Sequence, residues 1–199
     1  MWGCFPLYWA LLNHVNPSEV LIHRMLWAVP VLFFLVHFKA SWKSNFKDSL
    51  SSKKELVLLL ITAILITINW GGYIYAVNLG RVVEASMGYF LSPVINMIGG
   101  YIFFHERISK LKQLAVFFAT VGALYYVFSG DSFPWLGFVV GFTFSAYGIA
   151  RKAMASSAVP GLYIETLILL PFLLIFSLWF YANYDVAFLN VNISTNILL

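Results

Sequence analysis

The chain has 199 residues, of which 61% are apolar, 19% are aromatic and only 10% are charged. A soluble domain carries about 25% charged residues, so this composition excludes a fully water-exposed surface and predicts an integral membrane protein. The net charge of +4 would suggest nucleic acid as the partner of a soluble protein. Here the basic residues lie between apolar stretches, so we expect the lipid bilayer as partner and no nucleic acid.

Motifs for metal, nucleotide or catalytic chemistry are missing from the sequence. Cys4 is the one cysteine and the four histidines are scattered, which gives no set of metal ligands. There is no GxxxxGK[ST] phosphate loop, no HExxH and no GxSxG motif. We therefore expect no metal, no cofactor and no enzymatic activity.

Apolar stretches long enough to cross a membrane dominate the chain. A helix rises 1.5 Å per residue and the hydrocarbon core is about 30 Å thick, so a span needs roughly 20 apolar residues. We predict six full spans: Ser18–Phe38, Glu55–Leu79, Ala85–Phe104, Leu111–Ser129, Phe133–Ala150 and Gly161–Ala182. Met1–Leu12 and Leu189–Leu199 are too short and read as incomplete first and last spans, so we expect a chain truncated at both ends.

The cations indicate a topology. Ten of the twelve Lys and Arg residues lie in or next to three alternate loops, Lys39–Lys54, His105–Lys110 and Arg151–Pro160. The positive-inside rule places these loops in the cytoplasm and predicts a multi-pass protein of the cell inner membrane. Ala40–Ser52 is rich in Lys and Ser, which predicts a solvated cytoplasmic loop.

The third predicted span carries more polar groups than a lipid anchor needs. Tyr89, Pro93 and Asn96 share one helical stripe, and Glu84 lies on the neighbouring stripe. Pro93 cannot donate a backbone hydrogen bond and exposes a carbonyl one turn earlier. The stripe predicts the lining of a substrate cavity. The alternative is a kink with tight packing, in which Glu84 caps a helix N-terminus.

Other spans contain candidates for the same pathway. Arg24 lies about 9 Å inside the first full span, where it either faces a cavity or anchors at the interface. In the second span, Asn69 and Tyr73 share a face and Trp70 lies beside them, which suits contact with an amphiphilic solute. The glycines that follow Trp70 permit close helix crossing as the alternative.

Small residues predict helix packing in three spans. Ala115, Ala119 and Gly122 give the fourth span a small face, which suits a packing helix or a subunit interface. The expected packing positions in the third and fifth spans are Gly99, Gly100, Gly137, Gly141 and Ser145.

Two segments echo each other. Arg24 precedes Pro30 by six residues and Glu165 precedes Pro171 by six, and Tyr147 stands before the second copy. Five spans separate the copies, so they would run in opposite directions, as in the inverted repeats of many secondary transporters. We therefore add Tyr147 and Glu165 to the predicted pathway.

Taken together, these residues resemble the RarD family of EamA-type permeases in the drug/metabolite transporter superfamily. The matching words are Trp2-Gly3, His23-Arg24, Asn69-Trp70, Glu84-Ala85-Ser86, Gly88-Tyr89-Phe90, Pro93, Glu106-Arg107, Phe144-Ser145, Tyr147-Gly148, Arg151-Lys152, Ile164-Glu165-Thr166 and Leu170-Pro171. The resemblance implies a ten-helix bundle of two inverted five-helix halves around a central cavity. Residues 1–130 would be the first repeat and residues 131–199 the start of the second.

The functional hypothesis is a secondary transporter that exports or exchanges small amphiphilic metabolites or drugs, with a chloramphenicol link implied by the resemblance. A small-molecule substrate and a second copy in a homodimer are the further expected partners. The alternative is an inactive fragment or a non-transporting membrane assembly subunit.

Overall fold

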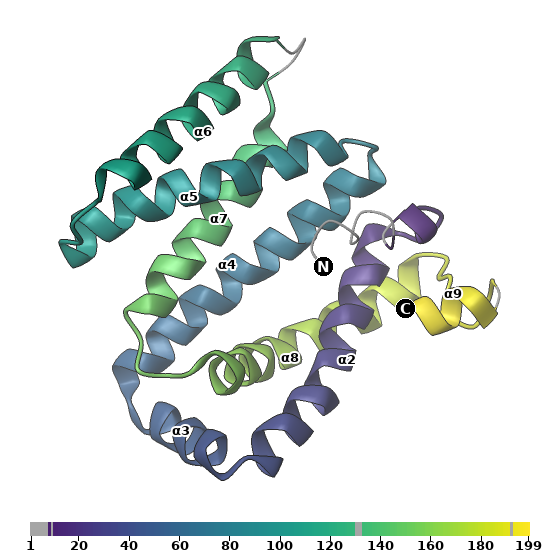
Figure 1. Cartoon of the computed structure of the whole chain (residues 1–199). Helices are drawn as coiled ribbons and strands as arrows, with labels where there is room; N and C mark the ends of the chain where they lie inside the picture. Colours follow the sequence, from purple (N-terminus) through teal and green to yellow (C-terminus); the bar gives the residue numbers. More distant parts are fainter. Residues whose placement is uncertain (1–7, 9, 130–132, 192) are drawn as a thin grey trace. The chain divides into compact units, whose positions relative to one another are not determined.

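The computed structural model describes residues 8, 10–129, 133–191 and 193–199, and its regular secondary structure there is helical. The helices are α2 (Pro17–Phe38), α3 (Ala40–Ser51), α4 (Lys53–Asn78), α5 (Val82–Phe104), α6 (Lys110–Ser129), α7 (Trp135–Lys152), α8 (Ala158–Asn183) and α9 (Ile193–Leu198) (Figure 1). This confirms the predicted all-α membrane bundle. The incomplete span predicted over Met1–Leu12 falls largely outside the described residues, and α9 occupies part of the last predicted stretch.

Local signals explain where the helices begin and end. The Asn16 side chain accepts a hydrogen bond of 2.9 Å from the Ser18 backbone N–H, and Pro17 occupies the first turn, where it needs no donor. At the end of α5, His105 adopts a left-handed conformation with φ of 52°. The next N–H, that of Glu106, donates to the Gly100 carbonyl at 3.2 Å, so the chain reverses there.

Within the described residues, five helices, α2, α4, α5, α6 and α8, are long and apolar enough to cross a membrane. The fifth predicted span, Phe133–Ala150, forms α7, which is helical over 18 residues and is not one of these five. It is shorter, about 27 Å by helical rise, and it ends on Arg151 and Lys152. Its small residues are used in packing, as described below.

The loop predicted at Ala40–Ser52 is wrong, because most of it forms α3. Its Lys and Ser content conceals a helical pattern in which Trp42, Asn45, Phe46 and Ser49 recur on one face. Phe46 packs against the buried cluster of α2 and α8, and its ring centroid lies 5.3 Å from that of Tyr163. Apolar burial of this face stabilises a helix that composition alone would not predict.

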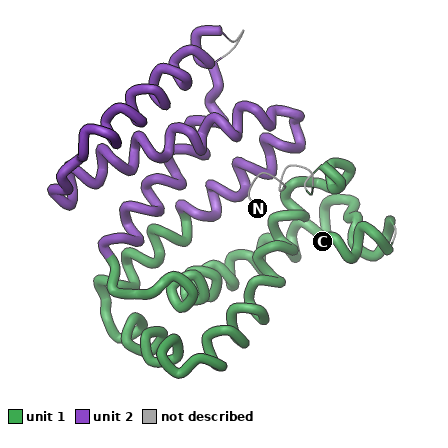
Figure 2. Tube along the Cα trace, in the orientation of Figure 1, with its two compact units in different colours: residues 1–64, 154–199 green, residues 65–153 purple. Residues whose placement is uncertain are grey.

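Contacts divide the chain into two compact units, residues 1–64 with 154–199 and residues 65–153 (Figure 2). The first contains α2, α3, the beginning of α4, α8 and α9. The second contains the rest of α4 with α5, α6 and α7. The predicted repeat boundary after residue 130 stays a prediction.

The cores of the two units differ in character. In the first unit, Leu32, Val36 and Tyr163 form a buried cluster where α2 meets α8. In the second unit, the helices α5 and α7 approach so closely that backbone meets backbone. A Cβ on Gly141 would lie 2.7 Å from the Gly88 carbonyl oxygen, and one on Gly88 would lie 2.9 Å from the Gly141 nitrogen. Glycine at these positions permits the contact.

Candidate functional site

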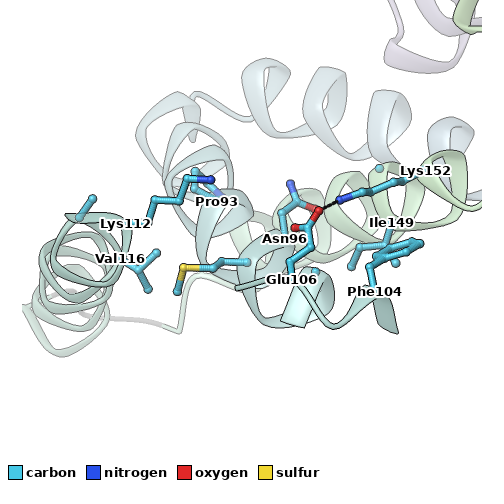
Figure 3. A pocket seen from close by; sticks show the side chains of 12 residues that line it. Pro93, Asn96, Phe104, Glu106, Lys112, Val116, Ile149 and Lys152 are labelled. Atoms are coloured by element: carbon cyan, nitrogen blue, oxygen red, sulfur yellow. Dashed lines mark hydrogen bonds and ion pairs between the residues drawn. The ribbon is translucent and has the colours of Figure 1, made fainter. Parts of the chain in front are cut away.

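A cavity of about 460 Å³ lies in the second unit, between α5, α6 and α7. This volume falls in the range of small-molecule sites. Figure 3 shows how its side chains converge from the three helices and from the turn after α5. The cavity is lined by Pro93, Asn96, Met97, Gly100, Phe104, Glu106, Lys112, Ala115, Val116, Gly148, Ile149 and Lys152. Apolar walls with a few polar groups suit an amphiphilic solute.

An ion pair stands at the charged end of the cavity. Lys152 Nζ, from the last turn of α7, donates to Glu106 Oε1 in the turn after α5 (Figure 3). The hydrogen bond and the charge of Lys152, with a smaller effect of Lys112, hold the pKa of the Glu106 carboxyl below its ordinary value of 4.5. Lys152 Nζ also lies 4.8 Å from the centre of the Phe104 ring. This end of the cavity therefore brings Glu106 together with Lys112 and Lys152.

Two of the predicted pathway residues line this cavity. Pro93 and Asn96 lie exposed on the α5 wall, so the amide of Asn96 is available within the cavity. A Cβ on Gly148 would lie 3.5 Å from Asn96 Oδ1, so the glycine leaves room beside that amide. Gly100 is equally important for space, because a Cβ there would lie 2.6 Å from Glu106 Oε2.

An aromatic cluster joins three helices of the same unit. The ring of Tyr89 on α5 lies 5.7 Å from that of Tyr73 on α4 and 5.6 Å from that of Phe144 on α7, measured between centroids. Tyr73 and Tyr89 are only partly buried, so their rings keep accessible surface. Trp70 and Tyr147 are also half-buried. These side chains can offer aromatic faces to a solute.

Asn69 and Glu84 take different positions from the cavity residues. Asn69 is buried, and its side-chain N–H₂ donates to the Val140 carbonyl at 2.8 Å, which ties α4 to α7. Glu84 Oε1 accepts a 2.7 Å hydrogen bond from the Leu136 backbone N–H, and its other oxygen pairs with Arg81 at 2.6 Å. In the structure, both polar groups hold helices together.

The small residues predicted to pack lie where two helices meet. Gly137 and Gly141 face α5, and Ser145 donates to the Gly141 carbonyl at 2.7 Å. A Cβ on Gly99 would collide with the Ile149 side chain. The predicted packing residues of α5 and α7 thus lie at the contact between these two helices.

Arg24 and Glu165 belong to the first unit. Arg24 is half-buried on α2. Glu165 is fully buried on α8, where the Thr62 hydroxyl donates to its Oε1 at 2.6 Å. Beside Arg24 in the sequence is His23, whose Nε2 lies 2.8 Å from the Tyr181 hydroxyl. Burial of a carboxyl at membrane depth marks Glu165 as a functional candidate.

Several residues of interest escaped the sequence reasoning. The sequence patterns mark three of them, Lys112, Lys152 and Glu106, only as loop charges or as parts of family motifs. All three line the cavity. Two further residues that the sequence patterns do not single out are Glu19 and Glu55. The available signal was their position, since each stands in the first turn of a long helix, as Glu84 does.

A metal site finds no support in the described ranges, which contain no group of three His, Cys, Asp or Glu side chains arranged to hold an ion. The candidate site therefore combines an apolar cavity, lined by the amide of Asn96 and the Glu106–Lys152 ion pair, with an aromatic cluster of the same unit.

The fold and this cavity define the class of protein: a multi-pass α-helical membrane protein with a solute-sized cavity among its helices. Residues 1–128 match the EamA-like transporter family, and the chain belongs to that family.

Three relatives illustrate the similarity. The uncharacterized transporter YojE of Bacillus subtilis is 35% identical over 173 residues, which cover 86% of this chain and 58% of the relative. Protein RarD of Escherichia coli is 36% identical over 171 residues, covering 86% and 57%. The chloramphenicol-sensitive protein RarD of Pseudomonas aeruginosa is 30% identical over 177 residues, covering 87% and 59%. The predicted RarD resemblance is thereby confirmed.

The chain spans less than two thirds of the length of these relatives. No solved structure matches it.

Proposed function

We propose that this protein is a secondary transporter of the inner membrane that moves small amphiphilic metabolites or drugs. The observation that carries the proposal is the cavity of about 460 Å³ between α5, α6 and α7, which combines apolar walls with Asn96 and a charged end. An apolar solute body would lie along the walls, while a polar group would reach the amide or the lysines. Family membership supports transport as the activity.

The proposed pathway also includes the aromatic cluster of Tyr73, Tyr89 and Phe144. Aromatic faces bind flat apolar solutes, and their cost in conformational entropy is low because few torsions become fixed. Within the first unit, Arg24 and Glu165 are separate candidates, as ionisable groups at membrane depth. The name of one relative, the chloramphenicol-sensitive protein RarD of Pseudomonas aeruginosa, supports chloramphenicol and related amphiphiles as the first solutes to test.

A transport assay tests the proposal. The chain is reconstituted into vesicles, and uptake of labelled chloramphenicol and of chemically related amphiphiles is compared with that of empty vesicles. Asn96→Ala and Tyr89→Ala are expected to lower uptake about tenfold or more, because each removes a group that contacts the solute. Asn190→Ala, in an exposed loop, is the matched control and should transport like the wild type.

The outcomes separate the hypotheses. Uptake that is unchanged in Asn96→Ala and Tyr89→Ala would overturn the cavity assignment. A chain that inserts and folds but moves none of the solutes would favour the non-transporting alternative.

The proposal includes a homodimer through α6. This helix packs along α5, yet most of its side chains are exposed, among them Phe117, Val121 and Tyr125. Its small residues leave open space, since a Cβ on Gly122 would meet nothing within 4 Å. In a Cys4→Ala background, Gly122→Cys should form a disulfide-linked dimer in the membrane. Monomers alone after oxidation would contradict the α6 contact.

A further inference from the structure

The helix α3 carries a charged stripe that the transport proposal does not use. Lys43 and Lys47 are one turn apart on one side of the helix, and Lys39 is the N-cap residue just before it; all three are exposed. Leu50 follows three residues later on the same side and is 43% exposed. The acidic residue of α3, Asp48, lies off this stripe. The helix and its N-cap residue thus present three exposed cations and an apolar side chain.

The packed side of α3 fixes how this helix is rotated about its axis. Asn45 Oδ1 accepts hydrogen bonds from the Ser157 backbone N–H at 2.9 Å and from its hydroxyl at 3.0 Å. Phe46 packs into the core cluster where α2 meets α8, and Ser49 is buried. These contacts hold the helix in one rotational setting, so the direction of the lysine stripe is determined by the fold.

The position of α3 relative to the bilayer follows from its neighbours. It begins directly after α2 and ends directly before α4, and both of these helices are membrane spans. The two ends of α3 therefore lie at the same membrane surface, and a helix of 12 residues, about 18 Å long, extends along that surface. This holds whichever side of the membrane that surface faces.

Further residues fit such an interfacial position. Phe38, at the end of α2, is 84% exposed and lies next to the first lysine of the stripe. Lys39 Nζ lies 4.4 Å from the centre of the Trp42 ring. Aromatic rings beside lysines are typical of the boundary between lipid tails and headgroups, where the lysine ammonium reaches the phosphates.

We propose that the stripe of Lys39, Lys43, Lys47 and Leu50 is a binding surface for anionic phospholipid headgroups. Basic amphipathic helices at a membrane surface attract anionic lipids through their lysines and insert their apolar side chains between them. The stripe offers three cations within the reach of one or two headgroups, and Leu50 contacts their acyl chains. A lipid bound there stabilises the corner that α3 forms with α2 and α8.

Lipid retention by the full chain tests this proposal. The protein is purified in a neutral detergent and exposed to phosphatidylglycerol or phosphatidylcholine with identical acyl chains, and the bound lipids are counted by native mass spectrometry. The wild type should retain phosphatidylglycerol in preference, and the preference should fall as salt is raised. Each lysine near an anionic surface contributes about fivefold in affinity, so Lys43→Gln with Lys47→Gln should weaken it roughly thirtyfold.

Two matched variants keep the result specific. Arg107→Gln with Lys110→Gln removes the same charge from exposed positions outside α3 and should change the preference by less than about threefold. Lys43→Arg with Lys47→Arg keeps the charge and should retain the preference. The proposal is overturned if the wild type holds both lipids equally, or if the control pair loses as much affinity as the α3 pair.

Discussion

At the scale of single residues, glycine decides how closely α5 and α7 approach. A Cβ on Gly141 would lie 2.7 Å from the Gly88 carbonyl oxygen and 3.3 Å from its Cα, and these backbone atoms cannot move away without shifting a helix. We expect Gly141→Ala to lower stability by about 1–3 kcal/mol, as overpacking does. The measurement is the melting temperature in detergent, which should fall by several degrees.

The matched control is Gly122→Ala on α6. A Cβ there meets nothing within 4 Å, so we expect no loss of stability. An equal fall of both melting temperatures would show that the close approach of α5 and α7 is not the cause.

Glu84 is a second residue with a defined structural task. Its Oε1 accepts the Leu136 N–H in the first turn of α7, a helix whose N-terminus has no side-chain cap of its own. Glu84→Ala would leave this N–H buried without an acceptor, at a cost of about 1–3 kcal/mol. Glu84→Gln keeps a carbonyl oxygen and should recover part of that loss. Equal thermal stability of the wild type and both variants would refute this assignment.

Glu106 predicts a pH dependence. Lys152 lowers the pKa of this carboxyl in the folded protein, so the ion pair stabilises the fold above the unfolded pKa and is lost as pH falls through the folded pKa. The wild type should therefore melt slightly above Glu106→Gln at pH 7. The difference should shrink as the pH drops below about 4.5, the ordinary value of the carboxyl. A difference that grows toward acid pH would contradict this sign.

At the scale of elements, three long helices each carry a glutamate with the same structural role. Glu19 on α2, Glu55 on α4 and Glu84 on α5 each stand in a first turn, where the helix dipole favours a carboxylate. Each also accepts a backbone N–H from a distant segment: from Ala187 and Phe188, from Ala155 and from Leu136, respectively. The helix ends are thereby tied to segments that are far apart in sequence.

The docking of α3 gives a prediction at this scale. Asn45→Ala removes the acceptor for two hydrogen bonds from Ser157, so α3 should detach more often from α8. Trypsin should then cut after Lys43 and Lys47 about tenfold faster, because cleavage follows the population of the opened segment. Ser44→Ala, at an exposed position of α3, is the control and should be cut like the wild type. Equal rates in all three proteins would show that Asn45 does not hold α3.

At the scale of the whole molecule, the predicted topology can be tested directly. In a Cys4→Ala background, Ser44→Cys and Ser109→Cys should react with a membrane-impermeant maleimide only from the cytoplasmic side. Asn183→Cys, at the end of α8, should react only from the opposite side. The expectation follows from the excess of lysine and arginine in the loops that contain or adjoin the first two positions. Labelling of all three from one side would contradict it.

The sequence by itself determined the helices that span the membrane. Apolar runs of about 20 residues have few alternatives in a bilayer, because each backbone group must find its hydrogen bond within the helix. The predicted ends of α2, α5 and α6 fall within a few residues of the observed ones for this reason. The family could also be predicted from the sequence, since its motifs are short segments of consecutive residues.

Only the tertiary structure decided what the polar residues do. Asn69 and Asn96 are both amides in predicted spans, yet the first donates to Val140, 71 residues away, and the second lines a cavity. The helix α3 escaped prediction because its stability comes from Phe46 and Asn45 meeting α8. Buried polar groups are satisfied by whichever distant partner the fold brings near, and periodicity within one segment does not contain that information.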